Sequence, residues 1–225
     1  MAEAVQRALV VGASGGIGAA LVAALSGGGW SVTALSRRDT GLDVTDEGSV
    51  ALALGTLEAP FELILIATGA LEIAGVGPEK SLRALDPAVM AAQFALNAIG
   101  PAMILKYVPR LLPRDRRAVI AALSARVGSI GDNHLGGWYS YRAAKAALNQ
   151  LVHTAAIEIG RSHKQAICVA LHPGTVATAL TANHGAGHPA IAPPEAAANL
   201  LAVIAGLGTE ASGGFFDWQG SRVPW

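Results

Sequence analysis

Tyr141 and Lys145 form a pair whose residue types and spacing could support proton transfer. They stand four positions apart, so on a helix both side chains lie on one face. A phenol has a reference pKa of about 10 and is mostly protonated at neutral pH, whereas a nearby ammonium favours the phenolate. Such a phenol can exchange a proton with an alkoxide. A lone Tyr-x-x-x-Lys also occurs by chance on surface helices. Whether this pair is catalytic therefore depends on the elements around it.

A glycine-rich segment after the first apolar run has the composition of a phosphate-binding loop. Gly12, Gly16 and Gly18 follow the run 7–11 and open a helical pattern. Glycines permit a tight turn and let a phosphate approach backbone N–H groups, and the helix N-terminus adds its positive dipole end. The spacing G-x-x-x-G-x-G differs from the G-x-G-x-x-G of many dinucleotide folds. The segment predicts a nucleotide site, with a plain glycine turn as the alternative.

Ser36, Arg37 and Arg38 follow the second apolar run. A site that prefers NAD would place Asp or Glu here for the ribose hydroxyls, whereas Arg accommodates a 2′-phosphate. The planar guanidinium binds phosphate through two charge-assisted hydrogen bonds. The residue types therefore favour NADP over NAD, the alternative being two solvated surface arginines.

The elements that would position these residues alternate along the chain. Short, continuously apolar runs are typical of buried parallel strands, and the segments between them have helical patterns. We expect strands at 7–11, 30–36, 63–67, 118–123, 166–171 and 213–216, and helices at 16–25, 45–57, 87–112, 139–159 and 194–204. This pattern predicts a doubly wound parallel sheet between two helical layers, a three-layer αβα fold in one domain spanning 1–225. Ligands of such sheets bind outside the carboxyl ends of the strands.

Composition excludes several classes of protein. The 16 basic and 16 acidic residues balance, 14% of the residues are charged, 52% are hydrophobic and the mean hydropathy is +0.44. A disordered chain needs low hydrophobicity and high net charge, and a nucleic-acid binder needs a basic footprint. A surface so poor in charge predicts a covered face, hence a homodimer or homotetramer. The single cysteine, Cys168, excludes an internal disulfide and is expected in the core.

Two stretches bear on location. The N-terminus runs directly into the first strand pattern and lacks a signal-peptide pattern, so we expect a cytoplasmic protein. Residues 87–105 carry no charge over 19 positions, close to the length of about 18 at which a membrane span is considered. Gln93, Asn97 and the Gly100-Pro101 pair would be costly in lipid, so we expect a buried or inter-subunit helix, kinked at Gly100-Pro101, and no membrane partner.

The combined motifs resemble the short-chain dehydrogenase/reductase family over nearly the whole chain. The resemblance is carried by GASGGIG at 12–18, LNAIGP at 96–101, YRAAK at 141–145 and HPGTVAT at 172–178. The tail 213–225, with FFDWQGS, and GGWYSY at 136–141 resemble the branch of C-factor proteins and sniffer-type carbonyl reductases. The resemblance implies a Rossmann-type oxidoreductase that transfers hydride between a nicotinamide cofactor and a carbonyl compound or secondary alcohol.

The resemblance also implies roles for individual residues. Tyr141 would be the general acid or base, Lys145 would hold the nicotinamide ribose and lower the Tyr pKa, and Asn97 would maintain a water in the proton relay. Motifs and resemblance together place the cofactor against Gly12, Ser14, Gly15, Gly16, Ile17, Gly18, Ser36, Arg37, Arg38, Asp43, Val44, Ala67, Thr68, Gly69, Tyr141, Lys145, Pro173, Gly174, Val176 and Thr178. No metal is expected, and His184 and His188 are interpreted as solvated loop residues.

The hydroxyl that polarises the substrate carbonyl is the first departure from the family. The family has a Ser-Ser pair before x-x-Gly, whereas this chain has Ser124 and then Ala125. We assign the catalytic role to Ser124, with Ser129, Ser140 or no hydroxyl as the alternatives. A missing donor of this kind can cost about 10²–10³ in rate.

Two further departures concern the cofactor's adenosine side. Only three residues separate Arg38 from Leu42, so the family's helix after the second strand is expected to be missing and 42–44 to form at most a vestigial edge strand. Ala67-Thr68-Gly69-Ala70 replaces the family's Asn-Asn-Ala-Gly, so a backbone-only role is expected for these residues.

The loop 179–192 is the expected substrate loop, and its glycines predict a mobile lid. Its composition names no particular carbonyl or alcohol. The alternative function is a dinucleotide-binding signalling or regulatory protein of C-factor type with weak catalysis.

Overall fold

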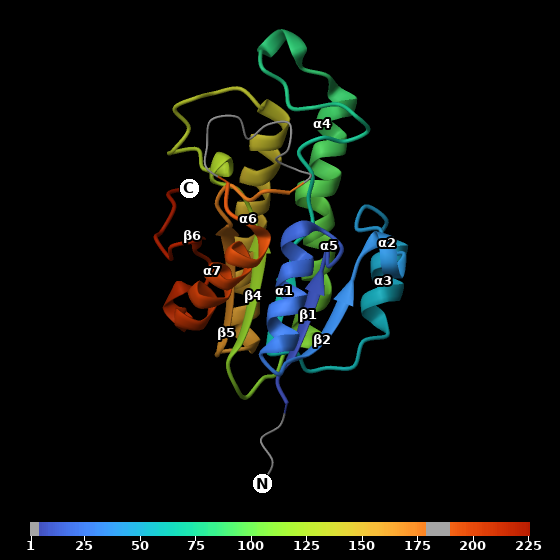
Figure 1. Cartoon of the computed structure of the whole chain (residues 1–225), viewed down its shortest axis with the longest axis vertical. Coiled ribbons are helices and arrows are strands. Elements are labelled where there is room, and N and C mark those ends of the chain that lie inside the picture. The colour runs from blue at the N-terminus through green and yellow to red at the C-terminus, as the bar shows by residue number, and fades with distance from the viewer. Residues whose placement is uncertain (1–4, 179–189) are drawn as a thin grey trace.

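A six-stranded parallel sheet with the order β2-β1-β3-β4-β5-β6 forms the centre of the molecule (Figure 1). The computed structural model describes residues 5–178 and 190–225. The strands are β1 (Arg7–Val11), β2 (Ser31–Leu35), β3 (Leu63–Ile66), β4 (Ala118–Leu123), β5 (Ala166–His172) and β6 (Phe215–Asp217). Every residue of β3 and β4 is buried, as expected where helices cover both faces of a parallel sheet. The predicted doubly wound fold is confirmed.

Helices form a layer on each face of this sheet (Figure 1). One layer holds α1 (Gly16–Gly27) and α7 (Pro193–Gly206), and the other holds α3 (Glu47–Gly55), α4 (Pro87–Phe94), α5 (Gly100–Leu111) and α6 (Tyr139–Ser162). Short 3-10 turns lie at Leu82–Ala84, Arg126–Gly128 and Thr209–Ala211. A hydrophobic cluster lies between the sheet and each helical layer. Leu21 and Leu200 belong to one cluster, and Ile104 and Leu148 belong to the other. Cys168 is buried in the second of these clusters, as predicted.

The connection after β2 contains no full crossover helix, as predicted. It holds a single helical turn, α2 (Arg37–Thr40), and Ser36 caps it by accepting a hydrogen bond from the Asp39 N–H. The turn closes at Gly41, whose φ is +72°, in the left-handed region that glycine adopts readily. Residues 42–44 form no strand, and Leu42 and Val44 are instead buried in the same hydrophobic cluster as Val50 of α3 and Ile104 of α5. β2 is therefore the edge of the sheet.

The long apolar stretch between β3 and β4 is helical but interrupted. A π-helical turn (η2, Ala95–Ile99) separates α4 from α5, so the irregularity lies just before the predicted kink at Gly100-Pro101. Pro101 has no N–H to give to the Asn97 carbonyl, which disrupts the α-helical ladder at this point. Residues Pro87–Leu111 are long and apolar enough to cross a membrane, and 39% of an apolar 18-residue stretch within them is buried in the structure. Here the stretch packs against α6 over the sheet, the arrangement of a core-covering helix.

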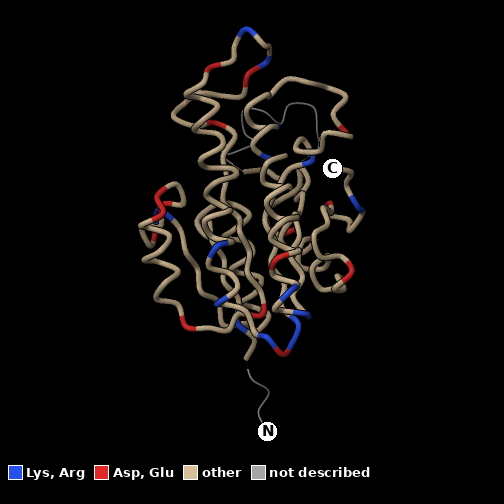
Figure 2. Tube along the Cα trace, turned by 180° about the vertical axis from the view of Figure 1, so that it is seen from behind, with Lys and Arg blue, Asp and Glu red and all other residues tan. Residues whose placement is uncertain are grey.

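The C-terminal tail docks on the end of β6 and on the loop after β4. The Trp225 ring stacks on Phe215 with centroids 5.9 Å apart, and the Trp225 carbonyl accepts a hydrogen bond of 2.8 Å from the Gly131 N–H. The tail therefore supports the loop that follows β4. Figure 2 shows charged residues mainly in loops and near the ends of elements, with long uncharged stretches between them.

Candidate active site

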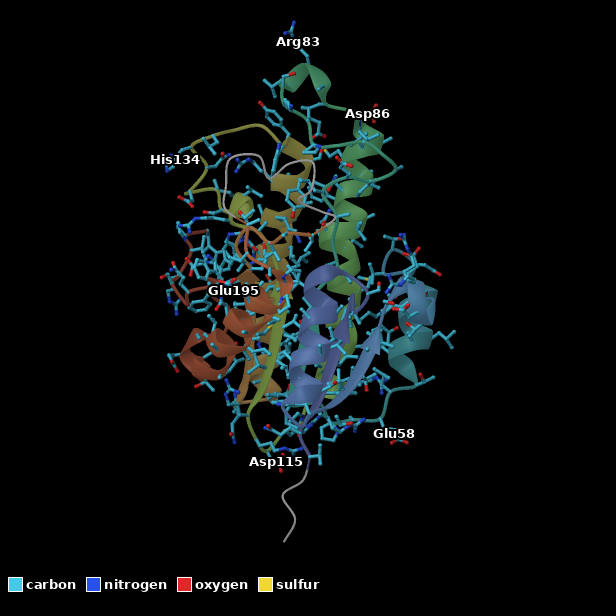
Figure 3. The ribbon with its side chains drawn as sticks, viewed as in Figure 1. Glu58, Arg83, Asp86, Asp115, His134 and Glu195 are labelled. Carbon is cyan, nitrogen blue, oxygen red and sulfur yellow. The ribbon has the colours of Figure 1, made fainter. Side chains whose placement is uncertain are left out.

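A cavity of about 940 Å³ opens at the carboxyl ends of the strands. The loop labelled by His134 lies at this end of the molecule, opposite Asp115 and Glu58, which precede β4 and β3 (Figure 3). The size suits a cofactor together with a small substrate. The glycine loop, the segment after β3, the ends of β4 and β5 and the start of α6 share its lining, which includes Gly15–Gly18, Ala67–Glu72, Leu123–Val127, Tyr141, Lys145 and His172–Val176.

The glycine loop needs glycine for close backbone packing. Gly12 has a φ of +92°, and a Cβ there would lie 2.6 Å from the Ala67 carbonyl oxygen. A Cβ on Gly18 would lie 2.1 Å from the Gly12 carbonyl oxygen. α1 begins at Gly16 with Gly15 as its N-cap, and no side chain caps it. The first residues of α1 line the cavity, and the N-terminus of a helix is a place that can accept a phosphate.

Tyr141 and Lys145 both lie in the first turns of α6 and line this same cavity. The Lys145 Nζ donates a hydrogen bond of 2.9 Å to the Leu123 carbonyl and lies 5.8 Å from the centroid of the Tyr141 ring. Burial raises the pKa of the Tyr141 phenol above its usual range and lowers the pKa of Lys145 to about 8. In this structure burial, and not the ammonium, dominates the phenol's pKa, contrary to the lowering expected from the pair alone.

Asn97 is buried in the π turn and holds the segment after β3. Its Nδ2 donates to the Ala70 carbonyl at 2.9 Å and its Oδ1 accepts from the Ala70 N–H at 3.1 Å. Gln93, one turn earlier, accepts from Asn97 Nδ2 and donates to the Leu71 carbonyl. A Cβ on Gly69 would lie 2.8 Å from Asn97 Oδ1 and 3.4 Å from Lys145 Nζ. Asn97 and Lys145 thus flank Gly69, although Asn97 itself does not line the cavity.

The three candidate hydroxyls each have a hydrogen-bond partner. Ser124 lines the cavity and donates to Asn149 Oδ1 at 2.6 Å. Ser129 donates to the Pro224 carbonyl at 2.5 Å, and Ser140 donates to the Glu79 carboxylate. Of the three, Ser124 is the one that lines the cavity.

Of the residues predicted on the adenosine side, Ala67, Thr68 and Gly69 line this cavity. The others lie outside its lining, on the segment after β2: Ser36, Arg37, Arg38, Asp43 and Val44. Ser36 is buried, whereas Arg37 and Arg38 are exposed. Arg38 pairs with Asp39 at 3.0 Å. Hydrogen bonds from Thr45 lower the pKa of the Asp43 carboxyl, with a smaller contribution from Arg37. Val44 packs on Gly100, where a Cβ would lie 2.8 Å from Val44 Cγ2.

The segment after β5 closes the other side of the cavity. Gly174 has a φ of +79° and lies under Trp218, whose Cδ1 would be 3.0 Å from a Cβ there. Thr178 lies over the glycine loop, since a Cβ on Gly16 would be 2.7 Å from Thr178 Cγ2. Val176 pairs with Ile191 in an isolated bridge. Most of the predicted substrate loop, with His184 and His188, falls outside the described residues.

Several residues near the cavity escaped prediction. Trp138, Arg126, Arg142 and His172 line it, and burial lowers the pKa of His172 to about 4, with Arg126 adding to the lowering. Arg142 donates to the Gly137 and Val127 carbonyls, which ties the loop after β4 to α6. Arg142 lies within the Tyr-x-x-x-Lys motif and Trp138 lies three residues before it, a proximity that the sequence already showed. Across residues 5–178 and 190–225, no group of three His, Cys, Asp or Glu side chains could hold a metal ion.

The fold and the arrangement of this site define a class of protein. The family model for short chain dehydrogenases matches residues 6–188, and the chain belongs to this family. It is 38% identical over 144 residues to C-signal of Myxococcus xanthus, covering 63% of this chain and 81% of that protein. It is 35% identical over 188 residues to 1-hydroxy-2-glutathionyl-2-methyl-3-butene dehydrogenase of Rhodococcus sp. strain AD45, covering 83% and 80% of the two chains.

Solved structures show the same fold. An NADPH-bound carbonyl reductase from chicken fatty liver superposes with a TM-score of 0.82 at 24% identity, covering 98% of this chain and 99% of that one. The carbonyl reductase Sniffer of D. melanogaster superposes with a TM-score of 0.83 at 21% identity, covering 98% and 100% of the two chains. The predicted resemblance to the branch of C-factor and sniffer-type proteins is confirmed.

Proposed function

We propose that this chain is an NADP-dependent oxidoreductase that interconverts a carbonyl compound and an alcohol. The observation that carries the proposal is that Tyr141 and Lys145 line the same cavity as the opening glycines Gly15–Gly18. A proton donor and a phosphate-binding helix start thus face one space that is large enough for a dinucleotide and a small substrate.

The residues present fit a dinucleotide. The backbone packing at Gly12 and Gly18 leaves no room for a Cβ, as in a loop shaped for close approach of a pyrophosphate. The Thr68 hydroxyl, beside this loop, is buried without a hydrogen-bond partner, and it would give the adenosine ribose a polar contact beyond the expected backbone role. We assign Ser14, Ile17, Ala67 and Gly69 to the same side, and Pro173, Gly174, Val176 and Thr178 to the nicotinamide side. When bound, the cofactor supplies or accepts the hydride.

The chain's own residues handle the proton. With its pKa raised by burial, the Tyr141 phenol is protonated at neutral pH and is ready to donate to the oxygen of a reduced carbonyl. Lys145, fixed on the Leu123 carbonyl, would bind the nicotinamide ribose and supply positive charge as the phenolate forms. Asn97 keeps the segment after β3 in place beside Lys145. Ser124 would turn its hydroxyl from Asn149 to the substrate oxygen.

Arg37 and Arg38 support NADP over NAD. Both are exposed just after β2, where the cofactor's 2′-phosphate would lie in a doubly wound fold. Asp39 is the one acidic residue of this turn, and it is engaged by Ser36 and Arg38. Asp43 and Val44, on the next segment, would border the adenine.

A second candidate function is a signalling or regulatory protein that binds the dinucleotide with weak catalysis. It is favoured by the 38% identity to C-signal and by Ala125, which removes the second family serine. The intact Tyr141, Lys145 and Asn97 support retained chemistry.

We also propose a homodimer or homotetramer formed through the helical layer of α4, α5 and α6. Ile99 and Ile157 in this layer are half or more exposed, at 50% and 55%. Analytical ultracentrifugation at micromolar concentration would detect the oligomer, and a monomer would contradict it.

The decisive experiment on function is a screen of NADPH consumption over a broad panel of aldehydes, ketones, diketones and quinones, with NADH in parallel. We expect turnover of at least one carbonyl class and a preference for NADPH. NADPH binding without any turnover across the panel would favour the regulatory alternative.

A further inference from the structure

The start of α6 has an unusual backbone. Trp138, its N-cap, has φ +53° and ψ 42°, in the left-handed region, and its side chain caps nothing. Gly136 and Gly137 before it also have positive φ values, +64° and +65°. A bulky residue in this conformation is strained and persists only where its surroundings hold it. The helix that carries Tyr141 and Lys145 therefore depends on contacts from elsewhere at its first turn.

Glu79 supplies these contacts from a segment 61 positions earlier in the chain. Its carboxylate accepts hydrogen bonds from the Ser140 N–H at 3.1 Å and from the Ser140 hydroxyl. Its backbone carbonyl accepts from the Trp138 N–H at 2.6 Å. Glu79 and Ser140 are 6% and 1% exposed. Burial opposes ionisation of the Glu79 carboxyl, but the hydrogen bonds from Ser140 and from the backbone of Glu79 together outweigh it and hold the pKa below its usual range.

The residues that Glu79 holds are next to the site. Ser140 directly precedes Tyr141, and the Trp138 ring meets the Tyr141 ring edge-on with centroids 6.3 Å apart. Trp138 and Tyr141 both line the cavity. The segment that carries Glu79 is itself fixed at Ala70 by Asn97. The chain between Ala70 and Glu79 thus links the π turn to the start of α6.

We propose that Glu79 is a positioning residue that fixes the first turn of α6, so that Tyr141 and Trp138 face the cavity. It acts through Ser140 and the backbone of Trp138, and Glu79 itself is absent from the cavity lining. The inference rests on the proposed role of Tyr141. A carboxylate suits the place because it accepts both hydrogen bonds of Ser140 and adds negative charge at the N-terminus of a helix.

Hydrogen exchange and turnover of Glu79→Ala together test the inference. We expect the amides of residues 138–142 to exchange faster than in the parent protein. The kcat for NADPH-dependent reduction of phenanthrenequinone should fall by about 10- to 100-fold, since small misplacements of reacting groups have effects of this size. The Kd for NADPH, measured by tryptophan fluorescence, should stay nearly unchanged because the glycine loop is untouched. Lys80→Ala, one residue along on an exposed position, is the matched control and should match the parent in all three.

Two further variants keep the result unambiguous. Glu79→Gln retains one acceptor oxygen, so it should show a smaller effect in the same direction, and it replaces Glu79→Ala should that variant not fold. Tyr141→Phe in the same assay tests the proposed function: undiminished turnover there defeats the role of Tyr141, whatever Glu79 does. The exchange measurement needs no turnover. Parental exchange at 138–142 in the folded Glu79 variants, or parental kcat in them, would overturn the inference.

Discussion

Asn97 binds Ala70 through both polar atoms of that residue's backbone, donating to its carbonyl at 2.9 Å and accepting from its N–H at 3.1 Å. This amide joins the π turn to the segment that follows β3, and a Cβ on the neighbouring Gly69 would lie within 3.4 Å of Lys145 Nζ. The two hydrogen bonds thus connect the π turn to the segment Gly69–Ala70, which lines the cavity.

Asn97→Ala should therefore weaken both stability and catalysis. Each buried polar group left unpaired costs about 1–3 kcal/mol, and Ala70 would lose partners for two. We expect the free energy of unfolding in urea to fall by at least about 1 kcal/mol, with Asn199→Ala in α7 as a comparison. If Asn97→Ala is as stable as the parent protein, the two hydrogen bonds between Asn97 and the Ala70 backbone do not stabilise the fold.

Arg37→Ala should lower the affinity for NADPH by roughly 10- to 100-fold, the size expected for a lost charge-assisted hydrogen bond. Affinity for NADH, which lacks the 2′-phosphate, should change little. Arg38→Ala should have the smaller effect, because Arg38 already pairs with Asp39. Calorimetric titration with both cofactors measures the difference. Equal affinities for NADPH and NADH that Arg37→Ala leaves unaltered would refute the assignment of this position to the phosphate.

Ser124→Ala should lower kcat by about 10²–10³ if the Ser124 hydroxyl stabilises the developing oxyanion. The affinity for NADPH should remain. Ser129→Ala, measured on the same carbonyl, tests the first alternative. Ser140→Ala would also remove the hydroxyl bond to Glu79, so its loss of turnover is compared with that of Glu79→Ala. A large loss in Ser129→Ala together with full turnover in Ser124→Ala would transfer the role to Ser129.

Lys145 should make stability depend on pH in the alkaline range. Its pKa in the folded chain is about 8 against an ordinary 10.5, so between these values the unfolded chain binds more protons. The free energy of unfolding should therefore rise with pH across this window. Lys145→Met removes the titrating group, so the stability of the parent relative to this variant should increase from pH 7 to pH 10. If the stability of the parent relative to this variant stays constant or falls over this range, the pKa of Lys145 is not lowered by burial in the folded chain.

Most of the fold could be predicted from local patterns. Buried parallel strands are continuously apolar, so β4 was placed at its observed residues and β3 within one residue. The spacing of Tyr141 and Lys145 placed both on one helix face, and the glycines placed the loop after β1, because these features depend on residues close in sequence.

Long-range contacts and local backbone chemistry escaped prediction. Glu79 reaches Ser140 across 61 positions, and no spacing rule pairs a loop carboxylate with a helix that far along the chain. The sequence points to Ser36 as a cofactor contact, whereas in the structure its side chain caps the turn at α2. The phenol's pKa depends on burial, and burial becomes visible only when the layers are assembled.

We propose that Tyr141 supplies the proton beside a dinucleotide that rests on the opening glycines. The most direct test is to measure NADPH oxidation with a reactive diketone or quinone and NADPH affinity side by side in Tyr141→Phe. We predict that turnover is abolished while NADPH affinity stays nearly parental. Unchanged turnover in this variant would contradict the claim.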